Sequence, residues 1–376
     1  MADNKQNKRP NVPPLRFPEF TEPWERKTFG ECCSPLEYGM NAAAKEFDGN
    51  NKYIRITDID ETTSTYSTQD VVSPSGVLED KYLVCENDIL FARTGASVGK
   101  TYHYDKKDGK LYYAGFLIRA NVLPCNNSKF IFYQTQLPRY KKWVKIMSAR
   151  SGQPGINSLE FQSFNLFIPA RIEQDKIVSF INLLDRRIEV QSKLIEDLKQ
   201  LKSAICKKLL SHSSWNEYII DDICDSVSFK EYIAEVEENG SFPIIQQGET
   251  PILGYGNKKP YYNYNSVIIF GDHTLSLYKP QVPFLVATDG VKMLSPKPFV
   301  TRDFLYYLIE TFMPISQGYK RHFSILKEQI VRLPSLKEQT IIGKRLSLLD
   351  TKIRIEQQLY DCYISQKQYL LGQMFI

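Results

Sequence analysis

The stretch that decides the fold is Arg171–Leu210, which reads RIEQDKIVSFINLLDRRIEVQSKLIEDLKQLKSAICKKLL. A second version closes the chain, because Leu336–Phe375 reads LKEQTIIGKRLSLLDTKIRIEQQLYDCYISQKQYLLGQMF. The two align without a gap at an offset of 165 positions, and both carry Glu-Gln, Leu-Leu-Asp and a proline shortly before the stretch, Pro169 or Pro334. This repeat predicts that the chain arose by internal duplication.

Apolar residues in both copies recur at alternating steps of four and three, which is the spacing of a coiled-coil seam. The seam is interrupted by polar residues at Gln191 and Lys202, and at the same two places in the second copy, Glu356 and Lys367. A shared interruption is stronger evidence of duplication than shared leucines. At roughly 1.5 Å per residue, about 38 residues give a helix of nearly 60 Å, too long for the interior of one compact domain.

Two interpretations of these helices remain open. Each could be a core helix or form a coiled coil between identical chains. The interpretation that we favour is an intramolecular antiparallel pair, with a globular segment attached to each helix and a pseudo-two-fold relation between the halves. The predicted fold class is therefore α+β, with two mixed α/β globules and two long helices that form an antiparallel coiled coil.

Composition sets broad limits. A chain of 376 residues suits two or three domains, and its apolar and charged fractions are those of an ordinary globular protein. The seven cysteines contain no CxxC pair, so they suggest neither zinc nor a disulfide framework, and a reducing cytoplasm is expected. The polar N-terminus and the lack of a long apolar run predict no signal peptide and no membrane span.

The net charge of +5 weakly suggests a polyanionic partner. The charge is uneven, because residues 1–169 carry 22 Lys and Arg against 19 Asp and Glu, whereas residues 213–335 carry 11 against 14. The second globule would therefore need a local basic cluster to bind a phosphate backbone.

The pattern divides the chain into five segments: a disordered tail 1–14, a first globule 15–169, a first long helix 170–212, a second globule 213–334 and a second long helix 335–376. The globules resemble each other at their edges. Trp24 and Trp215 stand in similar contexts near their starts, and Ile156–Leu159 resembles Phe323–Leu326 near their ends. Their interiors differ in sequence, which suggests one task performed on two different targets. Expected strands include Asp88–Arg93, Lys110–Asn121 and Ser266–Phe270, and Arg302–Phe312 is an expected helix.

Residues Thr94–Thr101, TGASVGKT, resemble a phosphate-binding P-loop. However, Gly95 and Gly99 are separated by three residues where that motif requires four, and a strand-prone segment follows where a helix is required. We therefore interpret the segment as a glycine-rich turn that lets the backbone approach a ligand. An ordinary surface hairpin is the alternative.

Two matching loops, Arg150–Gly155 and Gln317–His322, combine positive charge with an amide and precede the far edges of the globules. Such donors contact phosphates and purine edges, so a nucleic-acid contact is favoured over a solvated loop. The predicted DNA-binding residues are Arg93, Thr94, Gly95, Ser97, Lys100, Arg150, Ser151, Gln153, Gln317, Tyr319, Lys320 and Arg321.

No stretch indicates catalysis. Asp272-His273 and Asp289-Gly290 resemble active-site fragments, but such pairs are more often turn residues, and the four histidines lack metal-ligand spacing. We find no N/D-P-P-Y/F tetrapeptide and no glycine-rich cofactor loop of a methyltransferase. No catalytic residue and no metal ligand is predicted.

Together these features resemble the DNA-specificity subunit of bacterial type I restriction-modification systems. The resemblance rests on the Trp24 and Trp215 segments, the DILFARTG segment at Asp88–Gly95, Gly271–His273, and the two helices that follow Ile168-Pro169 and Leu333-Pro334. It covers nearly the whole chain after the tail, and it is specific as a set although each part alone is weak.

The resemblance implies two target recognition domains, each reading half of a split site in double-stranded DNA, and two spacer helices that set the gap and dock two modification subunits. It further implies no cofactor on this chain, S-adenosylmethionine, ATP and Mg on partner subunits, and motor-nuclease subunits for cleavage. Phe180, Val190, Ile355 and Leu359, which lie off the seam, are the expected partner contacts. The alternatives are a DNA methyltransferase or nuclease with unrecognised motifs, and a coiled-coil scaffold without catalysis.

Overall fold

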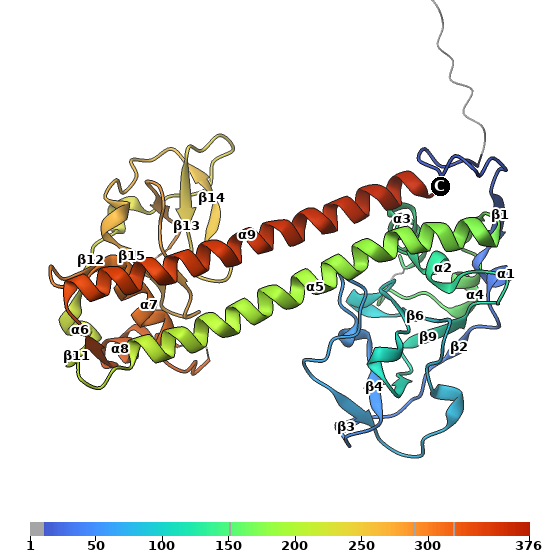
Figure 1. The fold of residues 1–376 in the computed structure, drawn as a ribbon, viewed down its shortest axis with the longest axis horizontal. Helices are drawn as coiled ribbons and strands as arrows, with labels where there is room; N and C mark the ends of the chain where they lie inside the picture. Colours follow the sequence, from blue (N-terminus) through green and yellow to red (C-terminus); the bar gives the residue numbers. More distant parts are fainter. Residues whose placement is uncertain (1–10, 150–151, 289, 319) are drawn as a thin grey trace, which may run out of the picture. The chain divides into compact units, whose positions relative to one another are not determined.

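The computed structural model describes residues 11–149, 152–288, 290–318 and 320–376. The chain divides into two compact units, Met1–Glu189 with Asp361–Ile376, and Val190–Tyr360. Figure 1 shows the two long helices, α5 (Arg171–Leu210) and α9 (Leu336–Met374), and each of them contributes a segment to both units. The prediction of two long helices and of mixed α/β globules is confirmed.

The first unit is built around a four-stranded sheet in the order β2-β9-β6-β7. Its elements before α5 are β1 (Glu25–Thr28), α1 (Phe29–Cys32), β2 (Glu37–Tyr38), β3 (Ala44–Glu46), β4 (Lys52–Ile54), β5 (Val72–Pro74), β6 (Asp88–Ala92), β7 (Thr101–His103), β8 (Leu111–Tyr113), β9 (Leu117–Asn121), α2 (Ser128–Gln134), α3 (Pro138–Met147), α4 (Ser158–Gln162) and β10 (Asn165–Ile168). All five residues of β6 are buried, as expected for a central strand.

The second unit has a four-stranded sheet in the corresponding order, β12-β18-β15-β16. Its elements before α9 are β11 (Asn216–Ile219), α6 (Ile220–Ile223), β12 (Cys224–Val227), β13 (Phe242–Ile245), β14 (Ile252–Gly256), β15 (Ile268–Gly271), β16 (Leu277–Tyr278), β17 (Leu285–Val286), β18 (Val291–Pro296), α7 (Arg302–Thr311), α8 (Phe323–Lys327) and β19 (Ile330–Leu333). Each unit also has one parallel pair, β4 with β8 and β13 with β17. The duplication therefore extends through the interiors, where the sequences showed no likeness.

A short antiparallel pair closes each globule. Strand β1 pairs with β10, with Glu25 opposite Ile168, and β11 pairs with β19, with Asn216 opposite Leu333. The tryptophan at the start of each globule is thereby brought to the proline that precedes its long helix. Trp24 is buried and donates from Nε1 to Glu173 Oε1 at 3.2 Å, so this side chain ties the start of the globule to the first turn of α5.

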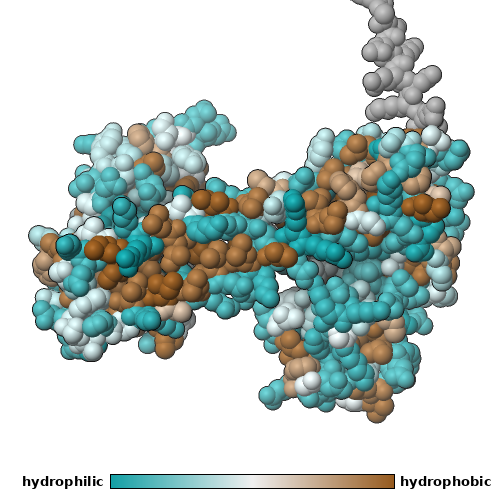
Figure 2. Space-filling model, in the orientation of Figure 1, coloured by the Kyte–Doolittle hydropathy of each residue, from teal (hydrophilic) through white to brown (hydrophobic). Residues whose placement is uncertain are grey.

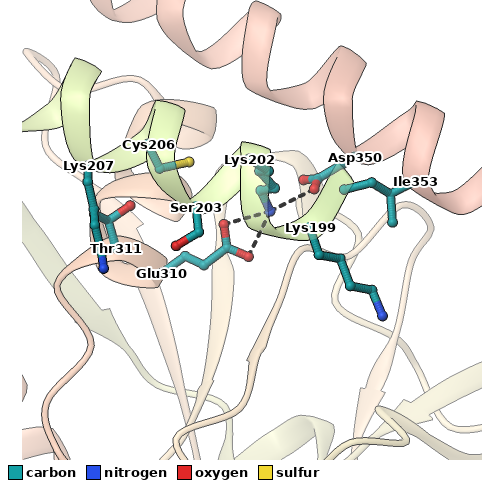
Figure 3. A pocket seen from close by; sticks show the side chains of 9 residues that line it. All are labelled: Lys199, Lys202, Ser203, Cys206, Lys207, Glu310, Thr311, Asp350 and Ile353. Carbon is teal, nitrogen blue, oxygen red and sulfur yellow. Dashed lines mark hydrogen bonds and ion pairs between the residues drawn. The ribbon is translucent and has the colours of Figure 1, made fainter. Parts of the chain in front are cut away.

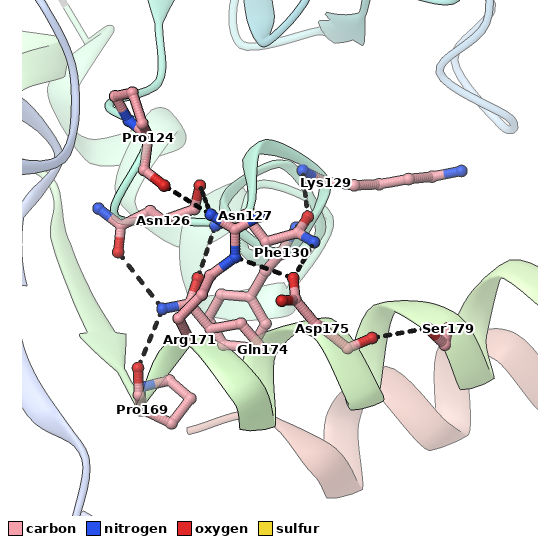
Figure 4. Close-up of polar contacts among 10 residues, drawn as sticks. All are labelled: Pro124, Asn126, Asn127, Lys129, Phe130, Pro169, Arg171, Gln174, Asp175 and Ser179. Carbon is pink, nitrogen blue, oxygen red and sulfur yellow. Dashed lines mark hydrogen bonds and ion pairs between the residues drawn. The ribbon is translucent and has the colours of Figure 1, made fainter.

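The repeated glutamine in the first turn of each long helix holds one helix of the adjoining globule. Gln174 Nε2 donates to the Pro169 carbonyl at 2.9 Å, and Gln174 Oε1 accepts from the Asn127 amide at 2.8 Å, as Figure 4 shows. In the second unit Gln339 donates to the Pro334 carbonyl at 3.0 Å and accepts from the Thr301 amide at 2.9 Å. Asn127 and Thr301 are the N-caps of α2 and α7.

Segments of the two long helices run antiparallel within each unit, because contacts pair rising positions of α5 with falling positions of α9. In the second unit Gln191 contacts Glu356, and Lys202 contacts Asp350. Gln191 Nε2 donates to Glu356 Oε2 at 2.6 Å and to the Glu356 carbonyl at 3.0 Å. Two interruptions of the predicted seam, which the repeat places at equivalent positions, therefore satisfy each other.

Two sequence expectations need correction. The expected strand Lys110–Asn121 is two strands, β8 and β9, because the Leu117 amide bonds the Ala114 carbonyl at 2.8 Å and closes a turn between them. Of the expected disordered tail, residues 1–10 lie outside the described part of the chain, but Asn11 accepts a backbone bond from Trp24 at 2.9 Å, so residues 11–14 are held against the first unit.

Among the described residues, no helix combines the length and apolar character needed to span a membrane.

Candidate nucleic-acid interface

In the first unit, the loop that follows the central strand β6 meets the loop that precedes α4. The Gly95 amide donates to the Pro154 carbonyl at 2.9 Å, and the Ile156 amide donates to the Arg93 carbonyl at 2.9 Å. Thr94 and Gly155 form an isolated bridge. These bonds bring the predicted residues Arg93, Thr94 and Gly95 together with Gln153, whose side chain is exposed.

Arg93 is held in place on this surface. Its Nε donates to the Gly115 carbonyl at 3.2 Å, and its guanidinium carbon lies 5.0 Å from the centre of the Tyr38 ring. Tyr38 Oη lies 3.2 Å from Ser158 Oγ and accepts from the Ser158 amide at 3.2 Å, and hydrogen bonds from Ser158 to this oxygen, together with the Arg93 charge, lower the pKa of Tyr38. Among the described residues, no hydrogen bond or ion pair engages the other two guanidinium nitrogens of Arg93.

The rest of the glycine-rich turn serves the fold. Ser97 belongs to a 3-10 turn, Gly95–Ser97, and its carbonyl accepts from the Lys100 amide at 3.0 Å. Lys100 Nζ lies 3.7 Å from Glu61 Oε2, so its charge already has a partner. Gly99 has a φ of +84°, and a Cβ there would lie 2.5 Å from Val144. The close approach at Gly99 is therefore to helix α3, which corrects the expectation that this glycine approaches a ligand.

In the second unit, the loop before α8 meets the loop after β15, which matches the arrangement in the first unit. The buried His322 fixes this contact. Its Nε2 accepts from the Gln317 amide at 3.0 Å, so the ring proton lies on Nδ1, which donates to the Asp272 carbonyl at 3.1 Å. The His322 amide donates to the same carbonyl at 2.9 Å. The loop from Gln317 to Arg321 is therefore anchored at both ends.

Lys320 and Arg321 project from this anchored loop. Both are exposed, and neither has an ion-pair partner among the residues that the structure describes. They supply the local basic cluster that the acidic second globule needs. Three further predicted contacts, Arg150, Ser151 and Tyr319, lie outside the described residues.

Asp272 is a structural residue. It is 2% exposed, and its Oδ1 accepts from the Phe323 amide at 2.8 Å at the start of α8. Lys292 Nζ lies 3.7 Å from its Oδ2. The resemblance of Asp272-His273 to an active site thus reflects a turn after β15 that is hydrogen-bonded to the start of α8, as the sequence favoured. Within the described ranges, no cluster of His, Cys, Asp and Glu has the geometry of a metal site.

Sequence reasoning missed several exposed aromatic and basic side chains. In the first unit, Phe116 is 58% exposed in the β8–β9 turn, and its carbonyl accepts from the Arg93 amide at 3.0 Å. In the second unit, Lys258 and Lys259 precede Tyr262, which is 61% exposed. Basic residues beside aromatic ones are a signal of nucleic-acid binding that the sequence contained at Lys258–Tyr262. Nothing in the sequence marks Phe116 as exposed, because the pattern predicts one continuous strand over Lys110–Asn121.

The four predicted partner contacts are all at least partly exposed. Val190 and Ile355 are 69% and 51% exposed, whereas Phe180 and Leu359 are both 38% exposed. Phe180 packs edge-on against Phe17 at 6.1 Å, so the N-terminal segment covers part of it. Figure 2 shows further hydrophobic surface over the part of α5 in the second unit, where Leu194 and Leu201 are exposed.

Comparison with known proteins explains this duplicated architecture. A family model described as the type I restriction modification DNA specificity domain matches residues 22–200 and again residues 212–361. The chain belongs to that family. It is a specificity subunit of a type I restriction-modification system, with two specificity domains in one chain.

Two proteins of Methanocaldococcus jannaschii are similar to this specificity subunit. One, named as the MjaX specificity subunit of a type I restriction enzyme, is 22% identical over 407 residues, which cover 93% of this chain and 92% of that protein. The other, the MjaVIII specificity subunit, is 21% identical and covers 75% of this chain and 76% of its own length.

Solved structures share the fold. The S subunit of a type I restriction-modification system from M. genitalium matches with a TM-score of 0.62 at 17% identity, covering 97% of this chain and 99% of that one. A chain from a study of complex assembly and conformational transition in the type I system matches with a TM-score of 0.52 at 16% identity, covering 94% of this chain and 97% of that one.

Proposed function

We propose that each globule reads one half of a bipartite site in double-stranded DNA, with target recognition domains at 15–169 and 213–334. One observation carries the proposal. The two units repeat the same sheet order, and in both the loop after the central strand meets the loop before a short helix, but the side chains on those loops differ. One scaffold with two sets of exposed side chains suits the recognition of two unlike sequences.

The exposed groups on these loops suit DNA. Arg93, Gln153 and Phe116 in the first unit offer a guanidinium, an amide and an apolar ring, which are groups that contact guanine, adenine and the thymine methyl group. Lys320 and Arg321 in the second unit offer charges for phosphates. Arg150, Ser151, Gln317 and Tyr319 complete the proposed contacts, together with Thr94, Gly95, Ser97 and Lys100.

We further propose that the helices 170–212 and 335–376 fix the gap between the half-sites as an antiparallel coiled coil and dock two modification subunits. Apolar side chains at Val190, Ile355, Phe180 and Leu359 lie outside the helix seam, where a purely solvated helix would be polar. In this proposal S-adenosylmethionine, ATP and Mg are bound by the modification and motor-nuclease subunits, and this chain performs no chemistry.

The deciding experiment is to map methylated bases in the host genome before and after deletion of this gene. The proposal expects one bipartite motif with an unread gap to lose methylation, and reintroduction of the gene to restore it. A chain in which residues 213–334 are exchanged for the corresponding domain of another specificity subunit should change one half of the motif and leave the other unchanged.

The same materials test the alternatives. The purified chain is mixed with S-adenosylmethionine and duplex DNA, with and without modification subunits. Methyl transfer by the chain alone would support an enzyme instead, and an unaltered methylation pattern after deletion would support a scaffold without a role in recognition.

A further inference from the structure

A partly buried polar cluster joins the globule of the first unit to both long helices. Tyr133 of α2 donates from Oη to Asp185 Oδ2 of α5 at 2.5 Å and to Asn182 Oδ1 at 3.0 Å. Lys367 of α9 forms an ion pair with Asp185 Oδ1 at 2.8 Å, and its ammonium lies 5.4 Å from the centre of the Tyr133 ring. Lys129 of α2 also lies 3.5 Å from Asp185 Oδ2, so this aspartate receives two contacts from the globule and one from the other helix.

The second unit contains an equivalent cluster, shown in part in Figure 3. Tyr307 of α7 donates to Asp350 Oδ2 of α9 at 2.6 Å and to Ser347 Oγ at 3.2 Å. Lys202 of α5 lies 2.7 Å from Asp350 Oδ1 and 2.7 Å from Glu310 Oε2, and its ammonium lies 5.2 Å from the centre of the Tyr307 ring.

The internal repeat relates the helix members of the two clusters one by one. The offset that aligns the long helices places Asp185 on Asp350, Asn182 on Ser347 and Lys202 on Lys367. The lysine in each cluster is the residue that interrupts the coiled-coil seam. A buried lysine in a seam lowers the stability of the coiled coil but specifies its pairing. Here each interruption receives a partner from the opposite helix and a tyrosine from a globule.

These contacts are well enough buried to impose geometry. The side chains of Lys367 and Lys202 are both 12% exposed, whereas their partners Asp185 and Asp350 are 24% and 36% exposed, so the clusters are partly buried. Burial alone would raise the pKa of Asp185, but the charge and hydrogen bond of Lys367 and the hydroxyl of Tyr133 outweigh it, so the pKa of Asp185 is lowered. Burial likewise opposes the charge on Lys202, yet its bonds to Asp350 and Glu310 leave the pKa of Lys202 raised. The Asp185 carboxylate and the Lys202 ammonium therefore stay charged at neutral pH.

Each cluster adds to other attachments between a globule helix and the helix pair. The repeated glutamine bonds the N-cap backbone of α2 or α7, at Asn127 or Thr301, and in the first unit the Asn127 side chain also donates to Asp175 Oδ1 at 2.7 Å. The tyrosine lies further along the same short helix. Polar attachments at two points along one short helix restrict its direction relative to the long helices.

We infer that the Tyr133–Asp185–Lys367 and Tyr307–Asp350–Lys202 clusters are positioning contacts that set the angle at which each globule presents its loops, and so determine which gap between half-sites is accepted. This inference rests on the proposed reading of a bipartite site. Among the described residues, no member of either cluster bonds a residue of the proposed reading loops, so loss of the clusters should change tolerance for the gap and leave both half-motifs intact.

The test uses the full complex with its modification subunits and compares Tyr133→Phe and Tyr307→Phe with the wild type. Each substitution removes one hydroxyl and keeps the buried ring. Methylation is measured on duplexes whose gap is native, or one base pair shorter or longer. Loss of a hydrogen bond to a charged group changes an equilibrium by about tenfold or more. Methylation at altered gaps, relative to the native gap, should rise by about that factor in each variant.

The matched control is Tyr53→Phe, which also removes the hydroxyl of a buried tyrosine, but one whose bonds to the Met40 and Ala42 carbonyls lie within the first globule and involve neither long helix. Its relative methylation at the three gaps should equal that of the wild type. Relative methylation that is also unchanged in both tyrosine variants would overturn the inference. If a variant transfers no methyl groups, binding of its complex to the same duplexes is measured, and an equal loss at every gap would also overturn it. A wild-type complex without any bipartite preference would instead refute the proposed function itself.

Discussion

Replacing Lys320 and Arg321, the two cations on the anchored loop of the second unit, should make the affinity for DNA depend less steeply on salt concentration. Lys320 and Arg321 are exposed, lack ion-pair partners among the described residues, and stand on a loop anchored by His322. We propose that each contacts one phosphate. The double variant Lys320→Ala/Arg321→Ala lowers the net charge from +5 to +3 without removing a described contact between side chains.

The magnitude follows from counterion release. Each phosphate contact contributes about −0.9 to the slope of log K against log salt, so raising the salt fourfold weakens binding by about 3.5-fold per contact. Two lost contacts should reduce the slope by about 1.8. Raising the salt from about 50 to 200 mM weakens DNA binding of both proteins, but the factor for the double variant should be roughly twelve times smaller than the factor for the wild type.

The assay is fluorescence anisotropy of the complex with modification subunits, on duplexes that contain or lack the methylated motif. The double variant should bind both duplexes more weakly at low salt, because phosphate contacts do not depend on sequence. Lys327→Ala is the matched control, since Lys327 lies nearby on α8 but is already paired with Asp221 at 2.7 Å. An unchanged slope in the double variant, or a changed methylation motif, would refute the assignment.

Three further predictions concern the fold and the helix surface. Burial, and secondarily the charge of Lys129, lower the pKa of His103 to about 4. Below about pH 6.5 the unfolded chain therefore binds a proton at His103 that the folded chain does not bind. The free energy of unfolding should fall by up to about 3 kcal/mol as the pH drops from about 6.5 towards 4. Denaturant titrations across that window should show a much weaker pH dependence for His103→Gln, and an equal dependence would contradict the assignment. Gly99→Ala should lower the free energy of unfolding by about 1–3 kcal/mol, because its Cβ would clash with Val144 at a positive φ; a variant with wild-type stability in the same titration would show that α3 yields there. Ile355→Glu combined with Leu359→Glu should abolish co-purification of a modification subunit, while the free energy of unfolding of the chain alone stays unchanged. A complex that still assembles on size-exclusion chromatography would exclude this face as the docking surface.

The sequence predicted which loops form the proposed interface but missed some of the side chains that lie beside them. The loops at Arg93–Gly95 and Gln317–Arg321 were identified because glycine, charge and amide groups occur there within a few residues. Tyr38 and Phe116 were missed because they reach Arg93 only through the pairing of β2 with β9 and the turn between β8 and β9. Contacts of that kind join residues far apart in the chain, and no local pattern reports them.

The sequence by itself determined the two long helices, their duplication and the two globules, because helical periodicity and an ungapped repeat are read within one continuous stretch. Only the tertiary structure decided that the globule interiors share one sheet order, since strand pairing depends on long-range packing that different side chains can satisfy equally well. It also decided the meaning of Lys202 and Lys367. In the sequence they are flaws in a seam, but in the folded chain each meets an aspartate from the other helix and a tyrosine from a globule. A charge in a buried seam is tolerated when its partners are supplied by segments that only folding brings together.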